Sequence, residues 1–181
     1  DKIELARKGE NNIFWSSKIK WFAKSSGTTN AKSKFIPVSN ESLEDCHYAA
    51  GKDLLCMYLS NNPNSQLFTG KSLRLGGSKT PYEKNGTFYG DLSAILIDNM
   101  PFWAEFSSTP SNKTSLMEDW DYKMVAIINE TLNENVTSLA GVPSWMLVLL
   151  NKILKESKKE YISEIWPNLE VYFHGGVSFK P

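Results

Sequence analysis

The sequence predicts an α/β fold with a mainly parallel sheet flanked by helices. Short apolar or alternating runs that suit strands take turns, along the whole chain, with longer segments of helical periodicity. Glycine pairs or a Gly-Val-Pro turn close three of the strand-like runs. The 181 residues, 41% hydrophobic and 22% charged, suffice for one domain with a core of its own.

The strand-like runs are recognised by alternation or by short apolar stretches between flexible residues. The clearest is KIKWFAK, in which polar and apolar residues alternate. The predicted strands are 18–24, 35–38, 71–75, 136–139 and 169–173. The predicted helices are 1–9, a long helix that starts after residue 39 or 40, a helix that follows Asp91, 118–132 and 144–155. The stretch 101–113 is expected to be mostly irregular.

The long helix is predicted to begin at a cap formed by Ser39 or Asn40 and to end at the turn 61–64. Apolar residues recur along it at helical spacing and predict one buried face. That face comprises Leu43, Cys46, Ala50, Leu54, Met57 and Tyr58. Cys46 and Cys56 are ten residues apart, or roughly 15 Å along a helix, which is too far for a disulfide. We expect two buried thiols in a reducing compartment.

Charge and hydropathy exclude several partner classes. Lys plus Arg equals Asp plus Glu at 20 each, so no overall field attracts nucleic acid or an anionic membrane. No apolar run approaches the roughly 20 residues of a membrane span. His, Cys and carboxylates do not recur at metal-site spacing, so no metal site is predicted. His47 is interpreted as structural. His174, at a strand end beside Gly-Gly, is interpreted as structural, with contact to substrate or base as the alternative, and the expected location is cytoplasmic.

The most informative stretch follows the first strong strand. Residues 25–33 are all small, polar or flexible, and Lys34 comes directly after them. Small residues let the backbone approach an anion, while hydroxyl and N–H groups can donate to phosphate oxygens. The candidate phosphate-binding residues are Ser25, Ser26, Gly27, Thr28, Thr29 and Lys34. A plain Ser/Thr-rich connection is the alternative interpretation.

A second stretch, residues 70–72, partly matches a phosphate-binding motif. Gly70-Lys71-Ser72 ends like a Walker A motif, but Ser65 stands where its first glycine is required. The three residues also lead into the predicted strand 71–75, whereas the motif needs a helix. We therefore predict that this stretch binds no phosphate.

The string SSGTT followed by a lysine resembles the phosphate-binding motif of the adenylate-forming superfamily. The longer string SSGTTNAKSKFIP resembles specifically the auxin-responsive Gretchen Hagen family of acyl-acid amido synthetases, including its bacterial members. In that family a Lys-x-x-Pro follows the motif, as Lys34 and Pro37 do here. Asn30 replaces the superfamily's next glycine and the lysine comes later, so either Lys32 or Lys34 reaches phosphate.

Two further pieces resemble the same superfamily, in the family's order and at about its spacing. The stretch 140–146 resembles the strand-to-helix turn that borders the acyl pocket, which implies an acyl-pocket role for Val142, Pro143, Trp145 and Met146. The strand that ends at Gly175-Gly176 resembles the one whose glycine pair packs against adenine.

The resemblance implies a parent enzyme that adenylates a carboxylic acid with ATP and Mg²⁺ and passes the acyl group to an amino acid amine. The family's magnesium, ribose and lysine-bearing parts would lie beyond Pro181, so no catalytic residue is assigned within the chain. Residues 1–181 are accordingly expected to be an inactive fragment of the ATP- and acyl-binding N-terminal domain, extended at both ends in the parent. The alternative is a non-catalytic α/β nucleotide-binding or interaction module.

Overall fold

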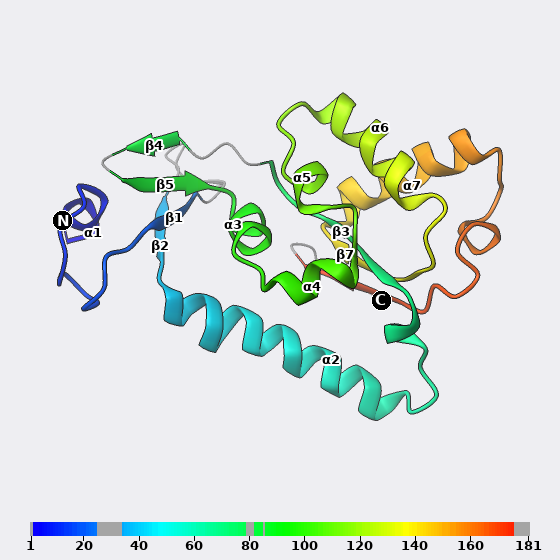
Figure 1. Cartoon of the computed structure of the whole chain (residues 1–181), viewed down its shortest axis with the longest axis horizontal. Helices are drawn as coiled ribbons and strands as arrows, with labels where there is room; N and C mark the ends of the chain where they lie inside the picture. The colour runs from blue at the N-terminus through cyan, green and yellow to red at the C-terminus, as the bar shows by residue number, and fades with distance from the viewer. Residues whose placement is uncertain (1, 25–33, 79–81, 85, 176–181) are drawn as a thin grey trace. The chain divides into compact units, whose positions relative to one another are not determined.

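The computed structural model describes residues 2–24, 34–78, 82–84 and 86–175. The chain divides into two compact units (Figure 1). Unit 1 comprises Asp1–Pro63 and Ser78–Leu96, and unit 2 comprises Asn64–Gly77 and Ile97–Pro181. Each unit contains a four-stranded sheet.

The sheet of unit 1 is mixed, with the strand order β2-β1-β5-β4. Its strands are β1 (Trp21–Lys24), β2 (Phe35–Val38), β4 (Tyr82–Lys84) and β5 (Thr87–Gly90). The central pair β1 and β5 is parallel, while β2 and β4 are antiparallel to their neighbours. Phe22 and Tyr89 stack across the central pair at 5.6 Å between ring centroids, beneath Ala6 of helix α1 (Lys2–Arg7). The short N-terminal helix is thereby confirmed.

Ser39 caps the long helix of unit 1, as predicted, because its hydroxyl accepts a hydrogen bond from the amide of Ser42 at 3.1 Å. The helix opens with a π-helical segment, Ser42–Tyr48, and continues as α2 (Ala49–Asn61). The part of helix α3 (Leu92–Asp98) that belongs to unit 1 ends at Leu96, whose carbonyl accepts a hydrogen bond from the Tyr48 hydroxyl at 2.9 Å.

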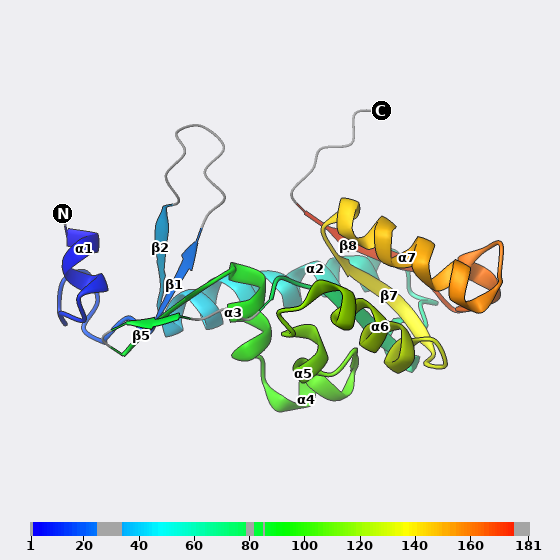
Figure 2. The same cartoon turned by 90° about the horizontal axis from the view of Figure 1, so that it is seen from above.

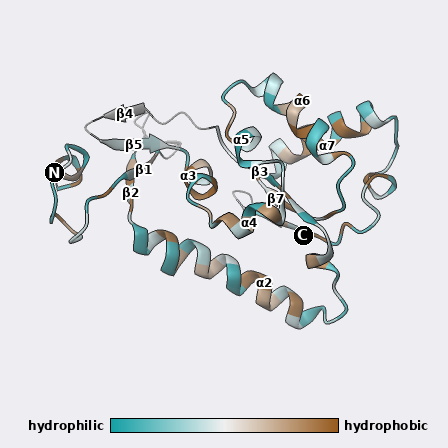
Figure 3. Cartoon of the chain, viewed as in Figure 1, coloured by the Kyte–Doolittle hydropathy of each residue, from teal (hydrophilic) through white to brown (hydrophobic). Residues whose placement is uncertain are grey.

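The predicted buried face of this helix is wrong. Of its six apolar positions only Leu43 is buried, and no residue of the described helix Ala49–Asn61 is buried. The expectation of buried thiols is also wrong, because Cys46 and Cys56 are both exposed. Ala50, Leu54 and Tyr58 still share one face of the regular helix α2, so the helical spacing holds, but no residue of that helix is buried by the described residues. Figure 3 shows polar and apolar residues intermixed along α2.

The sheet of unit 2 is parallel throughout, with the strand order β6-β3-β7-β8. Its strands are β3 (Lys71–Leu75), β6 (Ser108–Thr109), β7 (Val136–Gly141) and β8 (Val171–His174). Helices α6 (Trp120–Thr131) and α7 (Pro143–Ser157) pack on it (Figures 1 and 2). This sheet confirms the predicted α/β class with parallel strands flanked by helices.

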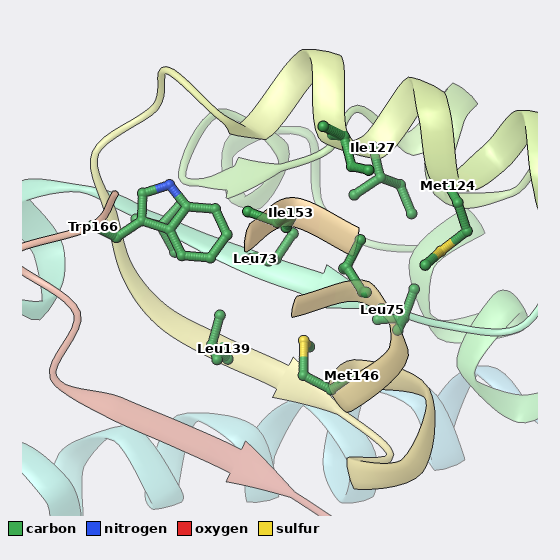
Figure 4. Close-up of a cluster of buried hydrophobic side chains, with 11 residues drawn as sticks. Leu73, Leu75, Met124, Ile127, Leu139, Met146, Ile153 and Trp166 are labelled. Atoms are coloured by element: carbon green, nitrogen blue, oxygen red, sulfur yellow. The ribbon is translucent and has the colours of Figure 1, made fainter. Parts of the chain in front are cut away.

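The core of unit 2 fills the space between these helices and one face of the sheet (Figure 4). Leu73 and Leu75 of β3 and Leu139 of β7 meet side chains from both helices. The helical contributors are Met124, Ile127 and Ile128 from α6 and Met146, Leu149 and Ile153 from α7. Trp166 closes the core, and its indole N–H donates to the Thr131 carbonyl at 3.3 Å.

Two predicted details need correction. The stretch 101–113, expected to be irregular, contains β6 and two short helices, α4 (Phe102–Phe106) and α5 (Asn112–Ser115). The antiparallel pair β4–β5 was not predicted, because its sequence lacks a sustained apolar alternation. Two 3₁₀ turns, Leu67–Thr69 and Ile162–Glu164, complete the described elements.

Candidate functional site

The order of the strands in unit 2 indicates where a ligand would bind. Along the chain, β3 comes first, β6 joins it on one side, and β7 and then β8 follow on the other side. The connections therefore diverge from the space between β3 and β7. In open parallel sheets, ligands bind outside the carboxyl ends of the strands at such a point of divergence. We take the carboxyl ends of β3, β7 and β8 as the candidate site and call them the carboxyl edge.

The three strands end level with one another. Leu75, the last residue of β3, is paired with Gly141 of β7, and Gly141 is paired with His174 of β8. The Tyr172 hydroxyl donates to the Gly141 carbonyl at 2.9 Å, and burial raises the pKa of Tyr172. Backbone and side chain thus fix the relative positions of these strand ends.

Gly141 is required by its surroundings. Its φ is +154°, and a Cβ at this position would lie 2.8 Å from the Leu75 carbonyl oxygen and 3.3 Å from the Leu75 Cβ. No ordinary side chain fits at such a distance from a backbone atom. The glycine of the predicted Gly-Val-Pro turn therefore lets β7 end tightly against β3 at the carboxyl edge.

Helix α7 starts at this edge. Val142 is its extended N-cap residue and Pro143 occupies the first turn, where a missing N–H has no cost. The Met146 amide donates to the Val142 carbonyl at 3.0 Å, which closes the first turn. The first amides of a 15-residue helix carry a partial positive charge toward the edge, which favours an anionic or strongly polar ligand group.

The four residues predicted to line an acyl pocket separate into two groups. Val142 is 41% exposed and Trp145 is 53% exposed, so both can contact a ligand beside Pro143. Met146 is 1% exposed and packs in the core. The Trp145 ring meets the Trp120 ring of α6 edge-on at 4.7 Å between centroids, which forms an aromatic wall. Contact of these residues with an acid stays a prediction.

The predicted adenine-binding pair lies after β8. Gly175 is exposed, and a Cβ added to it would meet nothing within 4 Å. Its partner Gly176 is outside the described residues. His174 is exposed at the end of the strand, with its ring 5.5 Å from that of Tyr172.

Of the predicted phosphate-binding residues, Ser25, Ser26, Gly27, Thr28 and Thr29 lie outside the described part of the chain. Lys34 is described and exposed, directly before β2. Lys32 lies outside the described part as well. The flanking strands β1 and β2 are antiparallel neighbours, with Lys24 opposite Phe35. The strands predicted on both sides of the segment 25–33 are confirmed, and the structure adds that they are paired.

Gly70-Lys71-Ser72 has a structural explanation. A Cβ at Gly70 would lie 2.2 Å from the Asn135 carbonyl oxygen, so only glycine fits there. The Lys71 ammonium forms an ion pair with Glu134 at 2.6 Å. The stretch leads into β3, as predicted, and not into a helix.

The sequence interpretation overlooked Lys123, which is 0% exposed on α6. Its ammonium donates to the carbonyls of Gly76 and Gly77, at 2.9 and 3.4 Å, directly after β3. The sequence did contain an indication that Lys123 is buried. Lys123 precedes Ile127 by four residues, so the two lie on the same helix face, which also carries Met124.

Arg74 was also overlooked. It alternates with Leu73 and Leu75 along β3, so its side chain points to the other face of the sheet. Its guanidinium contacts the Met100 sulfur and donates to the Asn112 side-chain oxygen at 3.2 Å. Burial lowers the pKa of Arg74 below its ordinary value.

Neither a metal cluster nor a membrane span is found in the part of the chain that the structure describes. No group of three or more His, Cys, Asp or Glu side chains among the described residues could hold a metal ion. Within the same residues, every helix is too short or too polar to cross a bilayer.

Solved structures share this fold. "AtGH3.15 acyl acid amido synthetase in complex with 2,4-DB" matches with a TM-score of 0.63 at 21% identity, covering 86% of this chain and 28% of the other. "GH3.15 acyl acid amido synthetase" matches with a TM-score of 0.64 at 21% identity, covering 85% and 27% respectively. The chain thus spans little more than a quarter of the length of these relatives. The comparison with curated proteins finds no match.

The sequence model of the GH3 family N-terminal domain matches residues 1–181, in agreement with the resemblance carried by SSGTTNAKSKFIP. The chain therefore belongs to the GH3 family and represents its N-terminal domain.

Proposed function

We propose that this chain supplies part of the nucleotide cradle and one wall of the acid pocket in an ATP-dependent acyl-acid amido synthetase. The observation that carries the proposal is the match of the GH3 N-terminal domain along residues 1–181. The solved relatives with this fold are acyl acid amido synthetases, and one was solved in complex with 2,4-DB.

The proposed reaction has two steps. A carboxylate oxygen of the acid attacks the α-phosphorus of ATP, the bond to pyrophosphate breaks, and an acyl adenylate forms. An amino acid amine then attacks the acyl carbon, AMP leaves with the electron pair of the acyl–oxygen bond, and the amine loses a proton. In the first step an enzyme acts mainly by stabilising the charge that develops on the phosphate oxygens.

Two parts of the chain have separate roles in this proposal. Ser25, Ser26, Thr28 and Thr29 donate to the phosphates of ATP, with Gly27 keeping the backbone close and Lys34 neutralising charge. At the carboxyl edge of unit 2, exposed apolar groups contact the acid and the glycine pair after β8 contacts adenine.

The apolar side of the carboxyl edge supports the second role. Val142 and Trp145 present exposed apolar surface next to the N-terminus of α7. An acid has an apolar body and an anionic head, which suits such a wall beside a helix N-terminus. Magnesium is expected for the whole family, but the described residues hold no cluster that fits it, so we derive no step through a metal.

The test is acid-dependent exchange of labelled pyrophosphate into ATP by the purified full-length parent. We expect exchange that requires both ATP and a carboxylic acid. Binding of ATP without exchange, over a broad panel of aromatic and aliphatic acids, would favour the alternative of a non-catalytic nucleotide-binding module. Absence of both binding and exchange would leave only an interaction domain.

A further inference from the structure

Lys123 is a charged group that the core of unit 2 encloses completely. It is 0% exposed, and its neighbours on α6, Met124 and Ile127, are equally buried. A buried ammonium without compensation is strongly unfavourable, because it loses its hydration. Retention of a lysine at a core position therefore needs compensating hydrogen bonds, and their location shows what the lysine holds.

The ammonium is bound at the carboxyl edge. It donates to the carbonyl oxygens of Gly76 and Gly77, at 2.9 and 3.4 Å. These are the first two residues after β3, whose pairing with β7 ends at Leu75 and Gly141. A glycine pair has no side chain to restrict its backbone, so the cation supplies the restriction. The segment that follows β3 is thus hydrogen-bonded to α6.

The position of Lys123 is itself well defined. Asp119 caps α6 by accepting a hydrogen bond from the Tyr122 amide at 2.9 Å, and the Lys123 amide donates to the Asp119 carbonyl at 2.9 Å. In the same first turn, Trp120 meets Trp145 of α7. The start of α6 therefore connects the turn after β3 with the aromatic wall at the start of α7.

We propose that Lys123 is a positioning residue for acid activation, which holds the Gly76–Gly77 backbone in the conformation that the bound acid and nucleotide require. This proposal rests on the function proposed above. Lys123 does not touch substrate. Its ammonium acts through the carbonyls of Gly76 and Gly77, which follow the end of β3.

The test compares two lysines of unit 2 in the full-length parent. Lys123→Met removes the charge and the donors while nearly keeping the side-chain volume. Lys71→Met is the matched control, because Lys71 starts the same strand at its opposite end and forms a part-exposed ion pair with Glu134. Lys123→Arg keeps a cationic donor and is the conservative variant.

We expect Lys123→Met to lower kcat for acid-dependent pyrophosphate exchange by about tenfold or more, since misplaced contacts in the transition state cost rate. The melting temperature should change by no more than about 5 °C, because an apolar side chain suits the core that surrounds it. Lys123→Arg should recover part of the lost rate. Lys71→Met should exchange pyrophosphate like the wild type.

Hydrogen exchange provides a second measurement that does not depend on activity. Lys123→Met should speed amide exchange at residues 76–78, while amides in the middle of α6 and α7 keep their protection. If the wild-type parent shows no pyrophosphate exchange, the proposed function fails, and this measurement still decides whether Lys123 fixes the turn.

Three results would overturn the inference. The first is wild-type exchange activity in Lys123→Met. The second is unchanged amide exchange at residues 76–78. The third is loss of folding in both Lys123→Met and Lys123→Arg, which would show that the lysine only supports the core.

Discussion

Residues predicted to bind ligand lie in both units, and the structure around them differs between the two. In unit 1 the segment 25–33 joins β1 to β2, which are antiparallel neighbours and consecutive along the chain. In unit 2 the carboxyl edge is assembled from the ends of three strands that are far apart in sequence, and from the start of α7, which directly follows β7. Substitutions in the first region should therefore change activity alone, whereas substitutions beneath the second should change stability as well.

The largest effect is expected for Gly27→Val in the full-length parent. A branched side chain in the proposed phosphate contact would push the backbone away from the anion, and displacement by about 1 Å can cost about 100-fold or more in rate. Acid-dependent pyrophosphate exchange should fall below detection. The melting temperature should stay at the wild-type value, because surface connections carry little packing energy.

A large fall in the melting temperature of Gly27→Val would contradict this separation of the two regions. It would mean that the segment 25–33 is needed to hold β1 and β2 together. Activity at the wild-type level would instead argue against any phosphate contact at this position.

The second prediction concerns the core beneath the carboxyl edge. Leu149 is 0% exposed on α7, so Leu149→Ala should lower the free energy of unfolding by about 2–5 kcal/mol through lost burial and a residual cavity. Leu54→Ala is the matched control, because Leu54 is 49% exposed on α2. Its effect should stay within about 0.5 kcal/mol. Urea unfolding measures both.

An equal loss of unfolding free energy in Leu54→Ala would show that α2 is covered in the full-length parent.

The exposed face of α2 was the main failure of the sequence interpretation. Helical spacing identified an apolar face, since Leu54 and Tyr58 recur on one side of α2, but no residue of that helix is buried by the described residues. Periodicity shows which side chains share a face, but it cannot show whether another element covers that face.

Three of the four strands in the parallel sheet of unit 2 were predictable because they are short and largely apolar and end in, or are followed by, glycine, whereas the two-residue strand β6 was not predicted. The predicted strand 71–75 matches β3, and the turn that begins at Gly141 lies where the Gly-Val-Pro motif placed it. Lys123 was not predictable by charge alone, because a lysine in a helix usually faces solvent. In the mixed sheet of unit 1, the pairing of β1 with β5 joins segments that are distant in sequence, which local patterns do not report.

The third prediction compares the proposed phosphate-binding residues 25–29 with the Walker-like stretch 70–72. Thr28→Ala deletes one proposed charge-assisted hydrogen bond to phosphate, worth about 1.5–3 kcal/mol. The adenylation rate should fall roughly ten- to a hundredfold if the bond forms mainly in the transition state. Ser72→Ala should have little effect, because Ser72 lies within β3 and its amide donates to the Ser107 carbonyl. A damaging Ser72→Ala with a silent Thr28→Ala would move the phosphate site to residues 70–72.

The smallest expected effect concerns the two capped helices. Ser39 accepts from the Ser42 amide at 3.1 Å in unit 1, and Asp119 accepts from the Tyr122 amide at 2.9 Å in unit 2. Ser39→Ala and Asp119→Ala should each lower the free energy of unfolding by about 1 kcal/mol, with the larger loss for Asp119, whose charge also favours a helix N-terminus.

The two cap variants should differ more clearly in how far along each helix amide protection is lost. Helix α6 is held by its buried face, so removal of Asp119 should loosen only the first turn and, through it, the position of Lys123. Helix α2 has no buried residue, so removal of Ser39 should raise amide exchange over several turns that follow the cap. Site-resolved hydrogen exchange measures this extent. Fraying confined to the first turn in both variants would show that the long helix of unit 1 is supported along its length, and that its exposed side chains do not reflect weak packing.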